Sequence, residues 1–317
     1  MNEPMPLRVT AREPMADDVV GLELARADGT ELPAWAPGAH IDLHLPAGRE
    51  TMIRQYSLCG DPRDRSRYRI AVLLAPSGRG GSRHIHDRLT EGDTVLTSPP
   101  RNTFELVPAE HYVFVAGGIG ITPILSMVHR VASSGTSWEL HYTGRTRRSM
   151  AFTSQLPGAG GSVTLAPRDE TGRLDVTHLL GMARTDTAVY CCGPESLLEA
   201  AEKATAHWPA GALHVERFVN SQTVHEPGDE PFDVELVLSG KTVTVEPGVS
   251  ILTAAASAGV RVFSSCREGT CGTCETFVVD GQVDHRDAVL TDEEKEESEV
   301  MMICVSRSRG GTLRLEL

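Results

Sequence analysis

SSCREGTCGTCETF, residues 264–277, places Cys266, Cys271 and Cys274 within nine positions. Three thiols so close together form disulfides, bind zinc or hold an iron–sulfur cluster. The chain has seven cysteines, an odd number, and its first residues, MNEPMPLRVT, contain no apolar leader segment. We therefore expect a cytoplasmic protein, and an odd cysteine count in a reducing compartment argues against a disulfide scaffold.

Extending the motif to Cys304 gives the pattern C-x4-C-x2-C-x29-C. Plant-type 2Fe–2S sites use a C-x4-C-x2-C loop followed by a distant fourth cysteine. Gly269 and Gly272 allow backbone conformations that a wrapped loop needs, and neighbouring backbone N–H groups can donate to the sulfurs. Structural zinc sites usually pair two C-x2-C elements or add histidines. Zinc stays the alternative, but the spacing favours a 2Fe–2S cluster on all four cysteines.

The composition excludes several classes of protein. At 317 residues, with 40% hydrophobic and 23% charged residues, the chain suits two or three globular domains. No run approaches the 18 apolar residues of a membrane span. Residues 229–317 carry 8 basic and 17 acidic residues, which is −9 of the total net charge of −13. This end disfavours nucleic acid and suits docking onto a basic protein patch, although the acidic run DEEKEES also serves solubility alone.

The pattern of elements changes along the chain and predicts three domains. Residues 1–102 contain short alternating strands such as HIDLHL (40–45) and YRIAVLL (68–74), which predict an antiparallel β-barrel. Residues 103–222 alternate apolar strands with helices, which predicts an α/β domain with a parallel sheet. Residues 223–231 are polar and rich in Pro and Gly, as a linker would be. Residues 232–317 form the domain of the cysteine motif.

Two turns of the middle domain predict a nucleotide site. AGGIGITP (116–123) follows an apolar strand and opens a helix, so its backbone and the helix N-terminus suit a diphosphate. Pro123 occupies the place of the final glycine in the usual G-x-G-x-x-G. CCGPESL (191–197) ends a later strand at another helix start, where open α/β sheets bind ligands. Cys191 and Cys192 could both be small buried residues; we favour that for Cys191 and take Cys192 as the site candidate.

Two further stretches lie in the first domain. RQYSLCG (54–60) puts Arg54, Tyr56 and Ser57 on one strand, where an aromatic ring, a hydroxyl and a cation could hold a ring system and a phosphate. SGRGGSRHIHDRL (77–89) is a Gly-rich stretch that leads into a possible helix, which is a second candidate phosphate loop. A barrel strand and a flexible loop would explain both stretches equally well.

Taken together, these motifs resemble the phthalate dioxygenase reductase family of ferredoxin reductase-type flavoproteins, and vanillate O-demethylase reductase components as well. The resemblance covers nearly the whole chain through RQYSL, SGRGGS, AGGIGITPILSM, CCGPESL, HVERF, the cysteine loop, DHRDAVLTDEEK and ICVSRS. It implies a multidomain fold with a flavin-binding β-barrel, an NAD(P)-binding α/β domain and an α+β, β-grasp ferredoxin domain. It also implies FMN rather than FAD.

The resemblance assigns site residues. In the family the R-x-Y-S strand binds flavin, with its tyrosine on the ring and its arginine near the phosphate, and the C-G-P cysteine lies near the reacting nicotinamide. Ser57 and Cys192 are thereby the catalytic candidates. The implied flavin-binding residues are Arg54, Gln55, Tyr56, Ser57, Ala71, Val72, Leu73, Gly80, Gly81, Ser82 and Phe218. The implied nicotinamide-nucleotide residues are Gly118, Gly120, Thr122 and Pro123.

The resemblance also implies an activity. A reductase of this family passes electrons from NADH to FMN, to the 2Fe–2S cluster and then to an external terminal oxygenase. We expect a Rieske non-haem iron oxygenase that hydroxylates or O-demethylates an aromatic acid, with a haem-thiolate monooxygenase as the alternative, and a monomer. Arg145, Arg147 and Arg148 of GRTRRS (144–149) could bind the 2′-phosphate of NADPH or form a solvated loop. A non-enzymatic iron–sulfur sensor or a zinc-stapled binding module remains a hypothesis of another class.

Overall fold

The computed structural model describes residues 3–48, 50–76, 78, 80–158, 160–220 and 228–317. The chain divides into two compact units, residues 1–216 and residues 217–317. The predicted linker, residues 223–231, lies largely outside the described residues, and its bounds stay a prediction. In the described ranges no helix is both long and apolar enough to cross a membrane.

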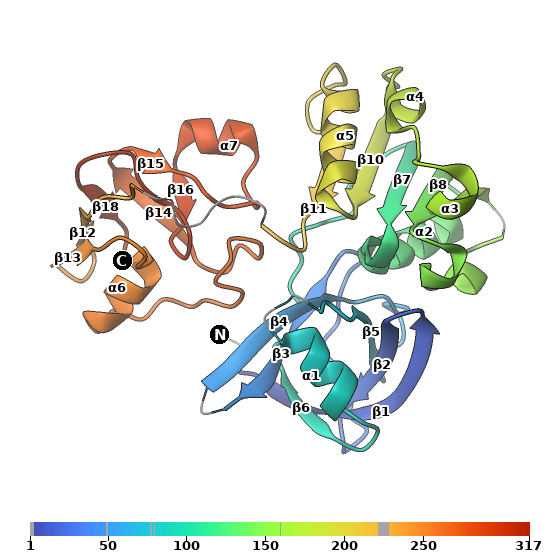
Figure 1. Cartoon of the computed structure of the whole chain (residues 1–317), viewed down its shortest axis with the longest axis horizontal. Coiled ribbons are helices and arrows are strands. Elements are labelled where there is room, and N and C mark those ends of the chain that lie inside the picture. Colours follow the sequence, from blue (N-terminus) through green and yellow to red (C-terminus); the bar gives the residue numbers. More distant parts are fainter. Residues whose placement is uncertain (1–2, 49, 77, 79, 159, 221–227) are drawn as a thin grey trace. The chain divides into compact units, whose positions relative to one another are not determined.

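The first half of the N-terminal unit is a six-stranded antiparallel sheet that curls into the predicted barrel (Figure 1). Ile41, Leu43 and Leu45 are buried at every second position of β3, as the alternation in HIDLHL predicts. Helix α1, Gly81–Arg88, packs on the barrel through the buried Ile85. The strands, in the order β4-β3-β6-β1-β2-β5, are β1 Met5–Ala16, β2 Val19–Ala25, β3 His40–Ala47, β4 Glu50–Ser57, β5 Tyr68–Leu73 and β6 Thr94–Thr97.

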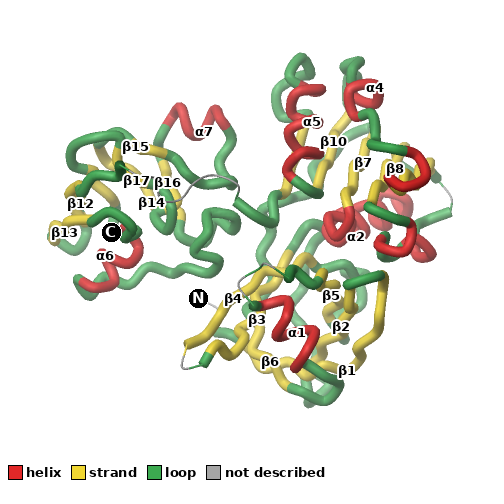
Figure 2. Tube along the Cα trace, viewed as in Figure 1, coloured by secondary structure: helices red, strands yellow, loops and turns green. Residues whose placement is uncertain are grey.

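The second half of the N-terminal unit is a five-stranded parallel sheet in the order β11-β10-β7-β8-β9. Helix α2 covers one face, and α4 and α5 cover the other (Figure 2). In chain order, β8 and β9 follow β7 on one side of it, and β10 and β11 then follow on the other side of β7. The elements are β7 His111–Gly117, η1 Gly118–Gly120, α2 Ile121–Ser134, β8 Ser137–Gly144, η2 Arg147–Ser149, η3 Thr153–Gln155, β9 Gly161–Pro167, α3 Arg168–Thr171, α4 Val176–Leu180, β10 Thr187–Cys192, α5 Glu195–Thr205 and β11 Leu213–Glu216.

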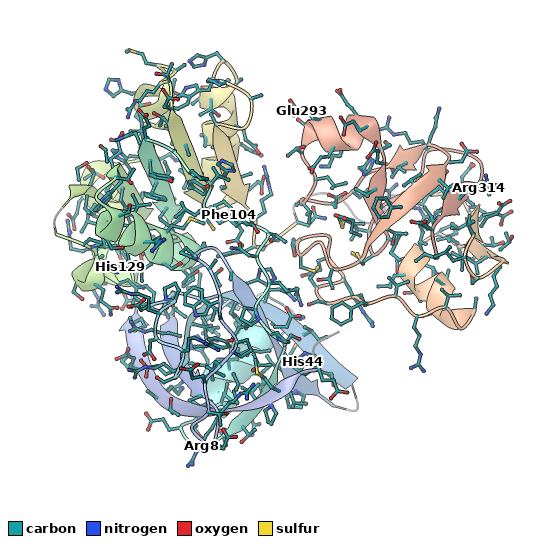
Figure 3. All side chains as sticks on the ribbon, turned by 180° about the vertical axis from the view of Figure 1, so that it is seen from behind. Arg8, His44, Phe104, His129, Glu293 and Arg314 are labelled. Carbon is teal, nitrogen blue, oxygen red and sulfur yellow. The ribbon has the colours of Figure 1, made fainter. Side chains whose placement is uncertain are left out.

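One hydrophobic cluster joins the barrel to the parallel sheet, beside the barrel's own core. Phe104, on the connection between them, packs edge-on against Tyr190 of β10 with ring centroids 5.4 Å apart (Figure 3). Barrel residues Val19, Cys59 and Ala71 belong to the same buried cluster. This shared cluster fixes the strand ends of the barrel relative to those of the parallel sheet.

The C-terminal unit has a five-stranded mixed sheet in the order β13-β12-β18-β14-β16, with helix α6 packed on its apolar face. Ser250 is the N-cap of α6, and its side chain accepts a hydrogen bond from the N–H of Thr253. Thr291 and Glu294 form a capping box at the start of α7. The elements are β12 Phe232–Leu236, β13 Lys241–Val245, α6 Ile251–Ser257, β14 Glu275–Asp280, β15 Val283–Asp284, α7 Asp292–Glu297, β16 Val300–Met302, β17 Arg307–Ser308 and β18 Leu313–Leu315, with β15 and β17 forming a two-stranded sheet.

Candidate flavin, nicotinamide and iron–sulfur sites

The structure brings the two predicted phosphate-binding stretches of the barrel together. Arg54 of β4 lies against the first residue of α1, because a Cβ on Gly81 would stand 2.7 Å from Arg54 Cγ and 2.9 Å from its Nε. Gly80 precedes the helix with φ of 87°, a conformation that favours glycine. Ser82 Oγ accepts a hydrogen bond from the N–H of Ala75 at 3.0 Å. A cation beside a helix N-terminus is a suitable cradle for a phosphate.

Other predicted flavin residues lie on the neighbouring strands. Tyr56 is half-buried on β4, and this burial raises the pKa of its phenol above the usual value. Gln55 donates through Nε2 to Asp42 Oδ1 at 2.9 Å. On β5 Ala71 and Val72 are buried in the protein interior, whereas the residue Leu73 is 40% exposed. A ring lying along β5 would therefore meet the strand's backbone and Leu73.

The candidate nucleotide site lies where the strand order of the parallel sheet reverses, between β7 and β10. β7 and β10 are neighbours, and their carboxyl ends carry the two predicted turns. A Cβ on Gly120 would overlap the Cys192 carbonyl, lying 2.5 Å from its carbon and 2.8 Å from Gly193 N. Gly118 has φ of 54°, and Thr122 Oγ1 donates to Ile119 O at 2.9 Å in the first turn of α2. Small residues thus let the two turns touch at the edge where such sheets bind nucleotides.

A polar cluster at three strand ends joins the candidate flavin strand β4 to the candidate nucleotide site. Glu216, the last residue of β11, pairs in register with Cys192 of β10, and its Oε2 lies 4.0 Å from Cys192 Sγ. The Glu216 carboxyl also hydrogen-bonds the hydroxyl of Ser57 at the end of β4. Burial raises the pKa of Glu216 to about 8, and the hydrogen bond from Ser57 opposes this shift. Burial and the nearby carboxyl also raise the pKa of the Cys192 thiol.

Glu216 is a candidate site residue that the sequence alone did not indicate. It stands in HVERF, next to residues implied by resemblance, but a single glutamate at a strand end carries no motif. The signal that could have found it is position: β11 is the strand beside β10, so its last residue lies beside the cysteine of C-G-P.

The four predicted ligand cysteines come together in the C-terminal unit. All four are buried, and all seven cysteines of the chain, each of which is described, are free of disulfides. The Cys266 thiol interacts with those of Cys271 and Cys304, and Cys304 interacts also with Cys274. Cys266 Sγ accepts hydrogen bonds from the N–H groups of Glu268 at 3.3 Å and Thr270 at 3.5 Å.

The fold explains how Cys304 reaches a loop 30 positions away. β14 begins directly after Cys274, and β16 ends two residues before Cys304. The two strands pair antiparallel, with Glu275 opposite Met302, so the cysteines at their ends meet. Gly269 and Gly272 have φ of 71° and 70°, the wrapped conformation expected of the loop. Four convergent thiols with backbone N–H donors on a sulfur fit a 2Fe–2S cluster.

Comparisons with known proteins agree with this geometry. Residues 236–309 match the family model of the 2Fe-2S iron-sulfur cluster binding domain. The chain is 40% identical over 98% of its length to the phthalate 4,5-dioxygenase oxygenase reductase subunit of Pseudomonas putida, covering 96% of that protein. The solved structure of phthalate dioxygenase reductase, described as a modular structure for electron transfer from pyridine nucleotides to [2Fe-2S], matches with a TM-score of 0.72 and 38% identity over 99% of this chain and 98% of that one.

The chain belongs to the phthalate dioxygenase reductase family. Another solved structure, an intact type IV self-sufficient cytochrome P450 monooxygenase, matches with a TM-score of 0.89 and 46% identity, covering 99% of this chain but 41% of that one. Membership confirms the predicted fold class, the oxidoreductase class and the cofactors FMN, NADH and 2Fe–2S, and with them rules out the zinc alternative. The family partners with terminal oxygenases as their reductase component.

The individual residue roles remain predictions. Ser57 and Cys192, the two catalytic candidates, share Glu216 as a neighbour. Phe218, implied by the resemblance to lie near the flavin, belongs to the C-terminal unit and is 40% exposed. Ser77 and Arg79 of the SGRGGS stretch lie outside the described residues.

Proposed function

We propose that this reductase delivers electrons from NADH, through FMN and a 2Fe–2S cluster, to a Rieske non-haem iron oxygenase that acts on an aromatic acid. The proposal rests mainly on two features of one chain. The Ser57–Glu216–Cys192 cluster lies between the proposed flavin strand and nucleotide site, and the C-terminal unit has four buried cysteines whose thiols interact. A bound flavin supplies the chemistry that couples a two-electron hydride donor to a one-electron iron–sulfur carrier.

On the flavin side, the chain's contribution is position and charge. Arg54 with Gly80, Gly81 and Ser82 would hold the phosphate at the start of α1, where a cation and helix N–H groups favour an anion. Tyr56 would lie along the ring, and the strand Ala71–Leu73 would line its edge. The FMN assignment rests on this compact cradle in the barrel and on family membership.

On the nicotinamide side, Gly118, Gly120, Thr122 and Pro123 would hold the diphosphate at the start of α2. The Cys192 side chain would limit the depth to which the nicotinamide enters, because Cys192 is the last residue of β10, beside β7. Burial raises the pKa of Glu216 to about 8, so its carboxyl would be mostly protonated beside Ser57 and Cys192 at pH 7. While the Ser57 hydroxyl donates to Glu216, the protonated carboxyl can donate its own O–H toward the reacting rings.

The surroundings of the arginine loop support NADH over NADPH. Arg147 forms a two-point ion pair with Glu170, at 2.7 and 3.1 Å, and Arg148 pairs with Asp17 at 3.1 Å. These two guanidinium groups already have carboxylate partners, and the third arginine of the loop, Arg145, is exposed directly after β8. A 2′-phosphate would have to compete with both carboxylates.

The proposed partner rests on the acidic charge of the C-terminal unit and on similarity to known reductases. The C-terminal unit is acidic, with Glu293 on the exposed helix α7 (Figure 3). Such a surface suits a basic patch on an oxygenase and gives salt-sensitive docking. One relative is a phthalate dioxygenase reductase subunit, which favours a Rieske partner. The similarity to a cytochrome P450 monooxygenase structure favours a haem-thiolate oxygenase as the second candidate.

Reconstitution separates the two candidates. The purified protein, NADH and either a Rieske aromatic oxygenase or a haem-thiolate monooxygenase are combined, and NADH oxidation coupled to product is measured at rising ionic strength. We expect coupled turnover with the Rieske enzyme that weakens with salt. Turnover with the haem-thiolate enzyme alone would overturn the proposed partner, while absence of NADH-dependent flavin reduction would overturn the proposed function itself. Light scattering of the same sample tests the expected monomer.

A further inference from the structure

The side chain of Asn220, near the start of the C-terminal unit, is bonded to the loop that carries three of the cysteines. Its Nδ2 donates to Glu268 O at 3.0 Å and to Arg286 O at 2.7 Å. A side-chain amide has two N–H donors, so one group satisfies both carbonyls. Asn220 therefore bridges the cysteine loop and the segment around residue 286.

These two partners of Asn220 are themselves tightly joined. Ala288 N donates to Gly269 O at 2.8 Å. A Cβ on Gly269 would stand 3.1 Å from Asp287 Cα and 3.2 Å from Asn220 Nδ2. The fully buried Asp287 holds its own segment by accepting from the N–H groups of Val289 and Leu290. The bridge made by Asn220 thus ends on a rigid part of the cysteine loop.

Arg286 also binds the chain on the far side of residues 221–228. Its guanidinium donates to the Asp229 carboxylate at 2.7 and 3.0 Å, and both side chains are at most 10% exposed. Arg307 lies 3.5 Å from the same carboxylate. A buried arginine–carboxylate pair of this geometry is costly to break. Asn220 and Asp229, which flank this segment, therefore both bind the same residue, Arg286.

Only a short piece of chain precedes Asn220. Glu216 is fixed by its pairing with Cys192 and its hydrogen bond with Ser57. From Glu216 to Asn220 is a step of four residues, whose contour is about 14 Å when fully extended. One end of this step belongs to the proposed hydride-transfer site and the other to the cysteine loop.

We infer that Asn220 is a positioning residue for electron transfer from the flavin to the cluster. Because Asn220 is bonded to the cysteine loop, the connection between Glu216 and that loop consists of residues 217–219. We call these three residues the joint, and the contacts of Asn220 keep it short. The polar segment predicted as a linker is flanked by Asn220 and Asp229, which both bind Arg286, so its length does not set the length of the joint. This inference rests on the proposed electron path, because it concerns the step between two of that path's carriers.

Matched insertions test which segment is the joint. One variant carries an extra Gly-Ser pair between Val219 and Asn220, which lengthens the joint by about 7 Å. The other carries the same pair between Val224 and His225. Flavin reduction by NADH and the following cluster reduction are recorded by anaerobic stopped-flow, with the reduced cluster quantified by electron paramagnetic resonance.

We expect both variants to reduce the flavin at the wild-type rate. Cluster reduction should slow by at least about ten-fold in the first variant only, because misplaced reaction partners cost orders of magnitude in rate. Slowing in the second variant but not the first would overturn the inference, as would equal rates in both. Loss of NADH-dependent flavin reduction in the wild-type chain would instead refute the proposed function.

An independent readout follows the contacts themselves. Asn220→Ala removes both hydrogen bonds, and Ser239→Ala removes a comparable side-chain bond to Leu236 O in the turn between β12 and β13. We expect the Ala288 amide to exchange hydrogen at least several times faster in Asn220→Ala, with flavin reduction unchanged and cluster reduction slowed. Ser239→Ala should match the wild type in all three. Wild-type exchange and wild-type cluster reduction in Asn220→Ala would contradict the inference.

Discussion

Gly120 offers a sharp test of the proposed nucleotide site, because its missing side chain is what lets two turns touch. In Gly120→Ala the new Cβ would lie 2.5 Å from Cys192 C and 2.8 Å from Gly193 N, both backbone atoms that cannot swing away. Ordinary contact begins at 3.4 Å, so the start of α2 and the end of β10 must separate by roughly 1 Å. A change of this kind in a packed interior costs about 1–3 kcal/mol.

The same separation reaches the reacting groups, since Cys192 and the α2 turn both line the proposed nicotinamide site. A displacement of about 1 Å typically costs about 100-fold in rate. We expect anaerobic stopped-flow to show flavin reduction by NADH about 100-fold slower in Gly120→Ala, with a melting temperature lowered by several degrees. Gly158→Ala is the matched control, because a Cβ at Gly158 meets nothing within 4 Å. Wild-type hydride transfer in Gly120→Ala would refute the placement of the nicotinamide at these two turns.

Three other predictions follow from the sites. Cys304→Ser should leave flavin reduction by NADH intact and abolish reduction of the partner oxygenase; unimpaired partner reduction would contradict the path through the cluster. A carboxyl whose pKa rises from 4.5 to about 8 on folding contributes stability that is complete below about pH 4.5 and is lost as pH rises to 8. Urea unfolding should therefore show stability falling by up to about 1.4 kcal/mol per pH unit between pH 5 and 8, and Glu216→Gln should flatten this fall; parallel curves for both proteins would argue against the raised pKa. Glu170→Ala frees Arg147 and should raise kcat/KM for NADPH relative to NADH by about two- to five-fold, the range that an exposed ion pair supports; an unchanged ratio would separate Arg147 from nucleotide selection.

The sequence predicted the elements whose patterns are local. Strands β3, His40–Ala47, and β5, Tyr68–Leu73, begin at the first residues of the predicted HIDLHL and YRIAVLL. Helix α1 follows the Gly-rich stretch, and α2 begins within AGGIGITP after β7. In these places residue spacing alone determines the structure, because the apolar period, the caps and the turn residues all lie within one element.

What the sequence could not predict depends on residues brought together by tertiary pairing. The contact between Gly120 and the Cys192 carbonyl requires that β7 and β10 be neighbours, which follows from sheet order and not from either motif. Glu216 joins Ser57 and Cys192 because three strand ends converge. Asn220 and Asp229 flank a segment that reads as a linker by composition, yet both bind Arg286, some 60 positions away. Such long-range hydrogen bonds leave no period or spacing in the chain.

The order of the carriers is the central claim, and it is tested most directly by removing the flavin alone. The flavin-free protein with its cluster intact is mixed anaerobically with NADH, and reduction of the cluster is followed by electron paramagnetic resonance before and after FMN is restored. The account predicts no cluster reduction without flavin and full reduction once FMN is bound. Cluster reduction by NADH in the flavin-free protein would contradict it.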